Sequence, residues 1–171
     1  MTGTEKTNKL VLTALMVCLV LLATYIIKIP SPFTQGYVHL GDTMIFLSVL
    51  LLGKKGGAAA AGLGSALADL LGGYAAYAPW TFLIKALMAF IMGAFIEAAT
   101  KKKKHHVKIG SVPVVEIVGM ILAGNLWSGI LGAPFNIGQF TVGLVLATIL
   151  AMALYKTPAK KLFVYRLDEI Q

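Results

Sequence analysis

Charged residues are scarce in this chain of 171 residues, where they make up 13% of the total and only seven are acidic. Hydrophobic residues make up 58%, and the mean hydropathy is +0.83. A soluble domain of this length could not carry such a composition without large exposed apolar patches. The composition therefore predicts a protein that is surrounded mostly by lipid.

Cysteine is almost absent, since Cys18 is the single example. One thiol inside an apolar run builds neither a disulfide framework nor a thiolate metal site. We expect no metal and no cofactor. The run that holds it, Leu10 to Ile27, is long for the apolar core of a signal peptide and lacks a convincing cleavage site, so we interpret it as a membrane span.

Motifs for catalysis are also missing. The sequence has no H-E-x-x-H, no G-x-S-x-G, no Walker loop and no cluster of carboxylates. We therefore do not expect the protein to be an enzyme. A chain without a Walker loop does not hydrolyse ATP itself, so any active transport implies a partner that supplies the energy.

What the sequence does have is a succession of apolar runs between charges or turn residues. The fold class that these runs predict is an all-α membrane protein, a compact bundle of six transmembrane helices in one domain of residues 1–171. The runs are Leu10 to Ile27, Asp42 to Leu52, Gly56 to Leu71, Pro79 to Ala99, Pro113 to Leu131 and Phe135 to Tyr155.

The positive charges alternate from one side of the bundle to the other. Thirteen of the 15 cations lie before the first run, after even-numbered runs or at the end of the chain. The positive-inside rule therefore predicts cytoplasmic termini and a multi-pass protein of a bacterial-type cell membrane. Because these charges form short clusters, we expect no nucleic-acid partner. The cluster from Lys101 to His106 is explained as a topology anchor or as a contact with anionic lipid.

The second run is too short to cross a membrane. From Asp42 to Leu52 a helix measures about 17 Å, against a hydrocarbon core of about 30 Å. The segment before it, residues 29–41, contains prolines and glycines that resist a continuous helix. We predict a partly re-entrant segment that helps to form a pocket open to the outside. Asp42 itself is explained as the N-cap of the short helix or as a ligand contact.

The third run is rich in alanine and glycine, and small residues recur at i+4 on two faces, as at Ala60, Gly64 and Ala68. Such faces allow close approach between helices in membranes. This pattern predicts that the third run occupies the centre of the bundle.

Two charges, Asp69 and Lys85, lie within apolar runs, where an unpaired ion is costly. They are explained either as a structural ion pair or by Lys85 donating to a ligand oxygen. Aromatic and polar side chains gather in the connections on the predicted outer side. These suit an interfacial aromatic belt or a pocket for a small, flat, neutral ring. With Lys85, the candidate binding residues are Gln35, Tyr37, His39, Tyr77, Trp80, Asn125, Trp127, Asn136 and Gln139.

Three segments carry a resemblance to a known family. They are Tyr37-Val-His-Leu-Gly-Asp42, Gly64-Ser-Ala-Leu-Ala-Asp-Leu-Leu-Gly-Gly-Tyr74 and Ala78-Pro-Trp-Thr-Phe-Leu-Ile-Lys85-Ala-Leu. With them the chain resembles, over nearly its whole length, the substrate-binding S components of energy-coupling factor (ECF) transporters. The match is to the branch with hydroxymethylpyrimidine, pyridoxine, riboflavin and pantothenate carriers. The resemblance implies a six-helix vitamin-binding subunit that docks on a transmembrane T component carrying two cytosolic ABC ATPases.

The family also implies a docking surface and a substrate. Members often show Ala-x-x-x-Ala on the first helix, and this chain has Ala14-Leu-Met-Val-Cys18, so Ala14 and Cys18 are the expected docking residues. We expect hydroxymethylpyrimidine or pyridoxine as the substrate, because the short chain and loops resemble those groups. Pantothenate and riboflavin are the alternatives within the family. A small membrane-embedded enzyme or assembly factor is the alternative outside it.

Overall fold

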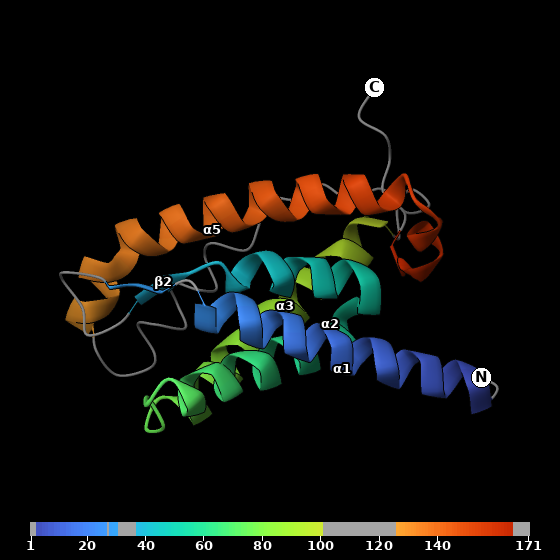
Figure 1. Cartoon of the computed structure of the whole chain (residues 1–171). Helices are drawn as coiled ribbons and strands as arrows, with labels where there is room; N and C mark the ends of the chain where they lie inside the picture. Colours follow the sequence, from blue (N-terminus) through green and yellow to red (C-terminus); the bar gives the residue numbers. More distant parts are fainter. Residues whose placement is uncertain (1–2, 27, 31–36, 101–125, 166–171) are drawn as a thin grey trace.

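The computed structural model describes residues 3–26, 28–30, 37–100 and 126–165. These residues form four α-helices, a two-stranded hairpin and a short 3-10 helix (Figure 1). Along the chain, the elements are α1 (Gly3–Ile26), β1 (Lys28–Pro30), β2 (Tyr37–His39), α2 (Gly41–Leu71), α3 (Ala78–Thr100), α5 (Leu126–Tyr155) and η1 (Pro158–Leu162).

Three helical stretches in the described residues are long and apolar enough to cross a membrane: Gly3–Ile26, Gly41–Leu71 and Ala78–Glu97. Thr141–Tyr155 is a shorter apolar helix. Most of the fifth predicted run lies outside the described residues. The predicted break before the sixth run is wrong, because α5 continues through residues 132–134. A helix at membrane depth tolerates a proline such as Pro134 when its surroundings satisfy the freed backbone groups.

The predicted break after the second run is confirmed as a kink inside α2. Gly53 has φ 72° and ψ −178°, a backbone conformation outside the helical range. This region is open essentially to glycine, because a Cβ atom would clash with the backbone. The kink divides α2 into a first half, residues 41–52, and a second half, residues 54–71.

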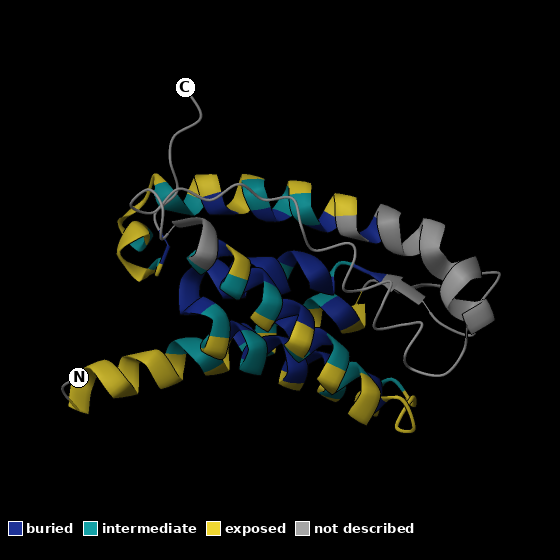
Figure 2. Cartoon of the chain, turned by 180° about the vertical axis from the view of Figure 1, so that it is seen from behind, coloured by how far each residue is buried: buried dark blue, intermediate teal, exposed yellow. Residues whose placement is uncertain are grey.

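The core is centred on the first half of α2. α2 contacts α1, α3 and α5, and it lies between α1 and α5 in Figure 1. Ile45, Phe46, Val49 and Leu50 are almost completely buried, and the centre of the molecule in Figure 2 is largely dark blue. Between helices in a membrane, such side chains stabilise the fold through close van der Waals packing.

The second half of α2 was predicted to lie in the centre of the bundle, with small residues on two faces. Both faces have a close neighbour: a Cβ on Gly64 would lie 2.7 Å from Val20 Cβ of α1, and a Cβ on Gly62 would lie 3.1 Å from Ala86 Cβ of α3. The leucines of this half, Leu63 and Leu67 among them, are exposed. Small residues therefore allow close packing against two helices, whereas the larger apolar side chains of the first half fill the core.

The segment before α2 is non-helical where the structure describes it, as its prolines and glycines predict. β1 and β2 pair in antiparallel register, with Lys28 opposite His39. The strand pairing is a feature that the sequence pattern did not indicate. It brings His39 directly to the start of α2. His39 is the first residue of the candidate site described below.

Candidate functional site

The centre of the site is a buried ion pair between the first turn of α2 and α3. Lys85 Nζ lies 2.8 Å from Asp42 Oδ1. Asp42 is fully buried and Lys85 is 8% exposed. Removing two charges from water costs several kcal/mol per ion, and this cost is offset only where geometry and further hydrogen bonds are good.

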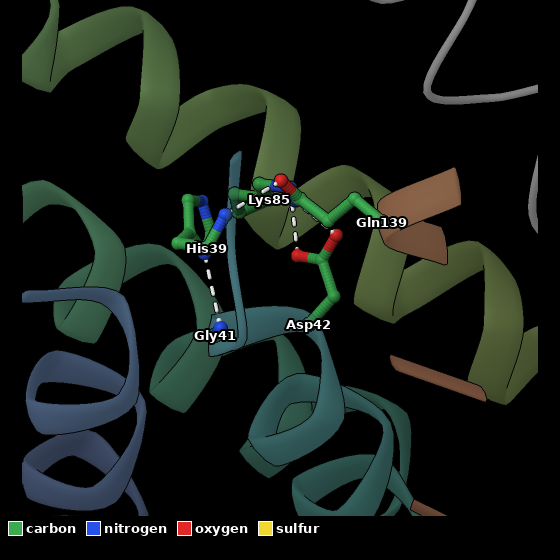
Figure 3. Close-up of polar contacts among 5 residues, drawn as sticks. All are labelled: His39, Gly41, Asp42, Lys85 and Gln139. Carbon is green, nitrogen blue, oxygen red and sulfur yellow. Dashed lines mark hydrogen bonds and ion pairs between the residues drawn. The ribbon is translucent and has the colours of Figure 1, made fainter. Parts of the chain in front are cut away.

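Gln139 of α5 supplies the further hydrogen bonds (Figure 3). Its Nε2 donates to the second oxygen of Asp42 at 2.6 Å. Its Oε1 accepts from the backbone N–H of His39 at 2.9 Å. One amide side chain therefore supplies a donor to the second carboxylate oxygen and ties α5 to the end of β2.

The imidazole of His39 closes the arrangement. His39 Nδ1 accepts from the backbone N–H of Gly41 at 3.0 Å, so any proton of the neutral ring resides on Nε2. Gly41 has no room for a side chain, since an added Cβ would lie 2.1 Å from Thr24 Oγ1. We call His39, Asp42, Lys85 and Gln139 the polar cluster. It joins β2, α2, α3 and α5 at one point.

The polar cluster corrects two predictions. For Lys85 the sequence left two explanations, an ion pair with Asp69 or a donor to a ligand oxygen, and the ion pair that the structure gives Lys85 is with Asp42. The sequence also favours Asp42 as an N-cap, but Leu40 occupies that position and no side chain caps the helix there. Asp69 is buried near the C-terminal end of α2. Both carboxylates are near helix ends, and tertiary packing selects the one that reaches Lys85.

Three of the predicted binding residues, His39, Lys85 and Gln139, come together in this cluster. Tyr77 and Trp80 are more than half exposed at the start of α3, which fits an interfacial belt as well as a pocket wall. Gln35 and Asn125 lie outside the described residues. For Tyr37, Trp127 and Asn136 the structure describes only the backbone, in β2 and α5.

Two hydroxyl groups beside the cluster are buried without a hydrogen-bond partner in the described part of the chain. They belong to Thr24, which packs against Gly41, and to Thr43, the neighbour of Asp42. A buried hydroxyl without a partner carries a desolvation cost of about 1–3 kcal/mol. These groups can therefore donate to or accept from a bound polar molecule.

The expected docking residues lie on a separate face. Ala14 and Cys18 are both exposed, one turn apart on α1. Among the described residues, no group of three or more His, Cys, Asp or Glu side chains could hold a metal ion. The polar cluster itself provides hydrogen bonds and a pair of opposite charges.

Comparison with known proteins covers most of the chain. A family model described as "ECF-type riboflavin transporter, S component" matches residues 4–156. This span includes the whole polar cluster and both expected docking residues. A protein of Pyrococcus woesei described as "Uncharacterized protein in gap 3'region" is 35% identical over 116 residues. The matched part is 67% of this chain and 76% of the relative.

Proposed function

The chain belongs to the ECF-type riboflavin transporter S component family, and we propose that it is the substrate-binding subunit of an importer for a small vitamin or vitamin precursor. The family is one of transporter subunits rather than enzymes. The family match over residues 4–156 is the observation that carries this proposal. The apolar helices and the absence of a Walker loop from the sequence agree with a membrane subunit that depends on an energy-supplying partner.

The substrate that we propose is hydroxymethylpyrimidine or pyridoxine. The reason is electrostatic: Asp42 already neutralises the ammonium of Lys85, so the cluster favours a neutral ligand over an anion such as pantothenate. An amide, an imidazole and two hydroxyls suit the ring nitrogens and hydroxymethyl groups of either compound. Riboflavin is the second candidate, and the description of the family model favours it.

We place the substrate on the outward side of the bundle. The distribution of lysines in the sequence supports cytoplasmic termini for a bundle of six helices. With that orientation the start of α2, and the polar cluster with it, faces the outside. The Thr24 and Thr43 hydroxyls beside the cluster support a polar ligand there.

The partners that we propose are a T component and two cytosolic ABC ATPases. The exposed pair of Ala14 and Cys18 on α1 supports docking at that face, because small residues allow a partner helix to approach closely. Energy for transport would then come from the ATPases.

The test combines ligand identification with transport. Protein purified in detergent is analysed by mass spectrometry for co-purified small molecules, and then titrated with hydroxymethylpyrimidine, pyridoxine, riboflavin and pantothenate. We expect tight binding of one of the first two compounds and uptake into vesicles only with added T component and ATPases. Tight binding of riboflavin or pantothenate would correct the substrate. Turnover of a compound by the isolated chain would contradict the proposal and favour a membrane enzyme.

A variant pair locates the site. Gln139→Leu removes the amide from the polar cluster, and we expect at least about tenfold weaker binding, which corresponds to about 1.4 kcal/mol. Trp80→Ala distinguishes a pocket wall from an aromatic belt. Loss of the indole should weaken ligand binding only if Trp80 lines the pocket. Unchanged affinity in Gln139→Leu would move the site away from the cluster.

A further inference from the structure

A second set of polar contacts lies at the other end of the first half of α2, at the kink. After η1 the chain returns to α2, and the backbone N–H groups of Val164 and Tyr165 both donate to the carbonyl oxygen of Leu50, at 3.1 and 3.4 Å. We call residues 163–165 the strap. It contacts the kink from the C-terminal side of α5.

The strap supplies the hydrogen bonds that the kink removes. In an uninterrupted helix the Leu50 carbonyl accepts from the N–H of Lys54. Gly53 breaks the helical register between them. The backbone N–H groups of the strap donate to Leu50 in place of Lys54. Each buried group that would otherwise lack a partner costs about 1–3 kcal/mol.

The side chain of Tyr165 also connects the kink to α3. Its hydroxyl lies 3.2 Å from Glu97 Oε1 and 3.4 Å from the carbonyl oxygen of Gly93. The other carboxylate oxygen of Glu97 pairs with Lys54 Nζ at 2.5 Å. α3 approaches closely here, since a Cβ on Gly93 would lie 2.6 Å from Lys54 Cα. Tyr165 is 6% exposed, although it follows a largely exposed segment.

We propose that residues 163–165 are a strap that sets the bend of α2 at Gly53 and thereby keeps Asp42 aligned with Lys85 and Gln139. The first half of α2 is a rod of 12 residues, about 18 Å long. The strap and kink hold one end, and the polar cluster holds the other. A rotation of about 10° at the kink would move the far end by about 3 Å, which exceeds the tolerance of a hydrogen bond. This inference is independent of the substrate.

Hydrogen exchange with residue resolution tests the strap in the full-length protein in lipid nanodiscs. Tyr165→Phe removes the hydroxyl and keeps the ring. We expect the local amide of residue 165, which donates to Leu50, and the distal amides of His39 and Gly41 to exchange about two- to tenfold faster, because each hydrogen bond contributes about 0.5–1.5 kcal/mol. Tyr155→Phe is the matched control: it removes a hydroxyl nearby while the ring keeps its edge contact with Phe163.

Two outcomes would overturn the proposal. Faster exchange at residue 165 alone would show that the strap caps the kink without positioning Asp42. Unchanged exchange at all three amides would show that the hydroxyl does not hold the kink. Val164→Pro provides a second variant, because it deletes a donor to Leu50 while the Val164 side chain is half exposed. We expect this variant to accelerate exchange at the same three amides.

Discussion

At the residue scale, the carboxylate of Asp42 is held from two sides, since Lys85 donates to one of its oxygens and Gln139 to the other. Three of the four members of the polar cluster, His39, Lys85 and Gln139, were predictable as candidate binding residues from residue type and position. The role of Asp42 was not. Its position after a glycine at the start of an apolar run is equally typical of an N-cap, and the sequence does not reveal which carboxylate packing brings to Lys85.

The first prediction concerns this ion pair. Asp42→Asn removes the negative charge that pairs with the buried ammonium of Lys85, and we expect a destabilisation of about 3–5 kcal/mol. Lys85→Met alone is expected to destabilise as well, because it removes the cation that pairs with the buried Asp42 carboxylate.

The double variant Asp42→Asn/Lys85→Met should lose much less stability than the two single changes together, because neither charge remains. Unfolding in detergent, followed by circular dichroism in a double-mutant cycle, measures the coupling. Lys156→Met, at an exposed lysine, controls for the loss of a cation. Additive effects of the two substitutions would contradict a direct pair.

At the scale of the element, α2 is the informative case. The two apolar runs and the glycines between them predict a break, and the structure confirms it at Gly53. The sequence did not predict which half of α2 contributes more to the core. Small residues indicate that helices pack closely, but they do not indicate which helix occupies the core. Hydrogen bonds from residues 164 and 165, more than 100 positions away, satisfy the kink. No local pattern indicates such a contact.

Gly53→Ala tests the kink. At φ 72° and ψ −178° an alanine is strained by about 1–3 kcal/mol. The space around the position is adequate, since the nearest atom to a new Cβ would be Val164 Cγ1 at 3.5 Å. We therefore expect the loss of stability to arise from the backbone alone. Gly3→Ala, where nothing lies within 4 Å, is the control and should change the free energy of unfolding by less than about 0.5 kcal/mol.

The Tyr165 hydroxyl predicts a dependence on pH. Burial and the adjacent Glu97 carboxylate raise the pKa of Tyr165 from 10 to about 12. A group whose pKa is raised by folding stabilises the fold while it is protonated in both states. That contribution is complete below about pH 10 and is lost as the pH rises toward 12.

The measurement is the melting temperature of the wild type and of Tyr165→Phe across this pH range. Lysines also titrate there, so the difference between the two proteins is the relevant quantity. The wild type should lose more stability than the variant as the pH rises. If the melting temperatures of the two proteins fall in parallel as the pH rises, ionisation of the Tyr165 hydroxyl does not affect stability.

At the scale of the whole molecule, the composition and apolar runs indicate a helical membrane protein, and the family match agrees. The structure describes three stretches able to span a membrane, while the count of six and the cytoplasmic termini stay predictions. The predicted end of the fifth run at residue 131 shows why the ends of a helix are harder to predict from sequence than its existence. Gly132 and Pro134 are typical helix breakers in water, yet α5 passes through them.

Ala14→Trp tests the docking face proposed for α1. A bulky ring on an exposed small-residue face should block assembly with the T component and leave ligand affinity unchanged. Leu83→Trp, at an exposed position of α3, is the control for an added indole in lipid. Co-purification of the complex measures assembly. Normal assembly of the Ala14→Trp protein would place the contact on another face.

The polar cluster also has a consequence for biogenesis. Its members enter the membrane in order, with Lys85 43 residues after Asp42 and Gln139 97 residues after it. A lysine in the middle of an apolar segment opposes insertion by about 2.5–3.5 kcal/mol. When α3 leaves the ribosome, its counter-charge on α2 has therefore already been synthesised, and α5 completes the cluster last.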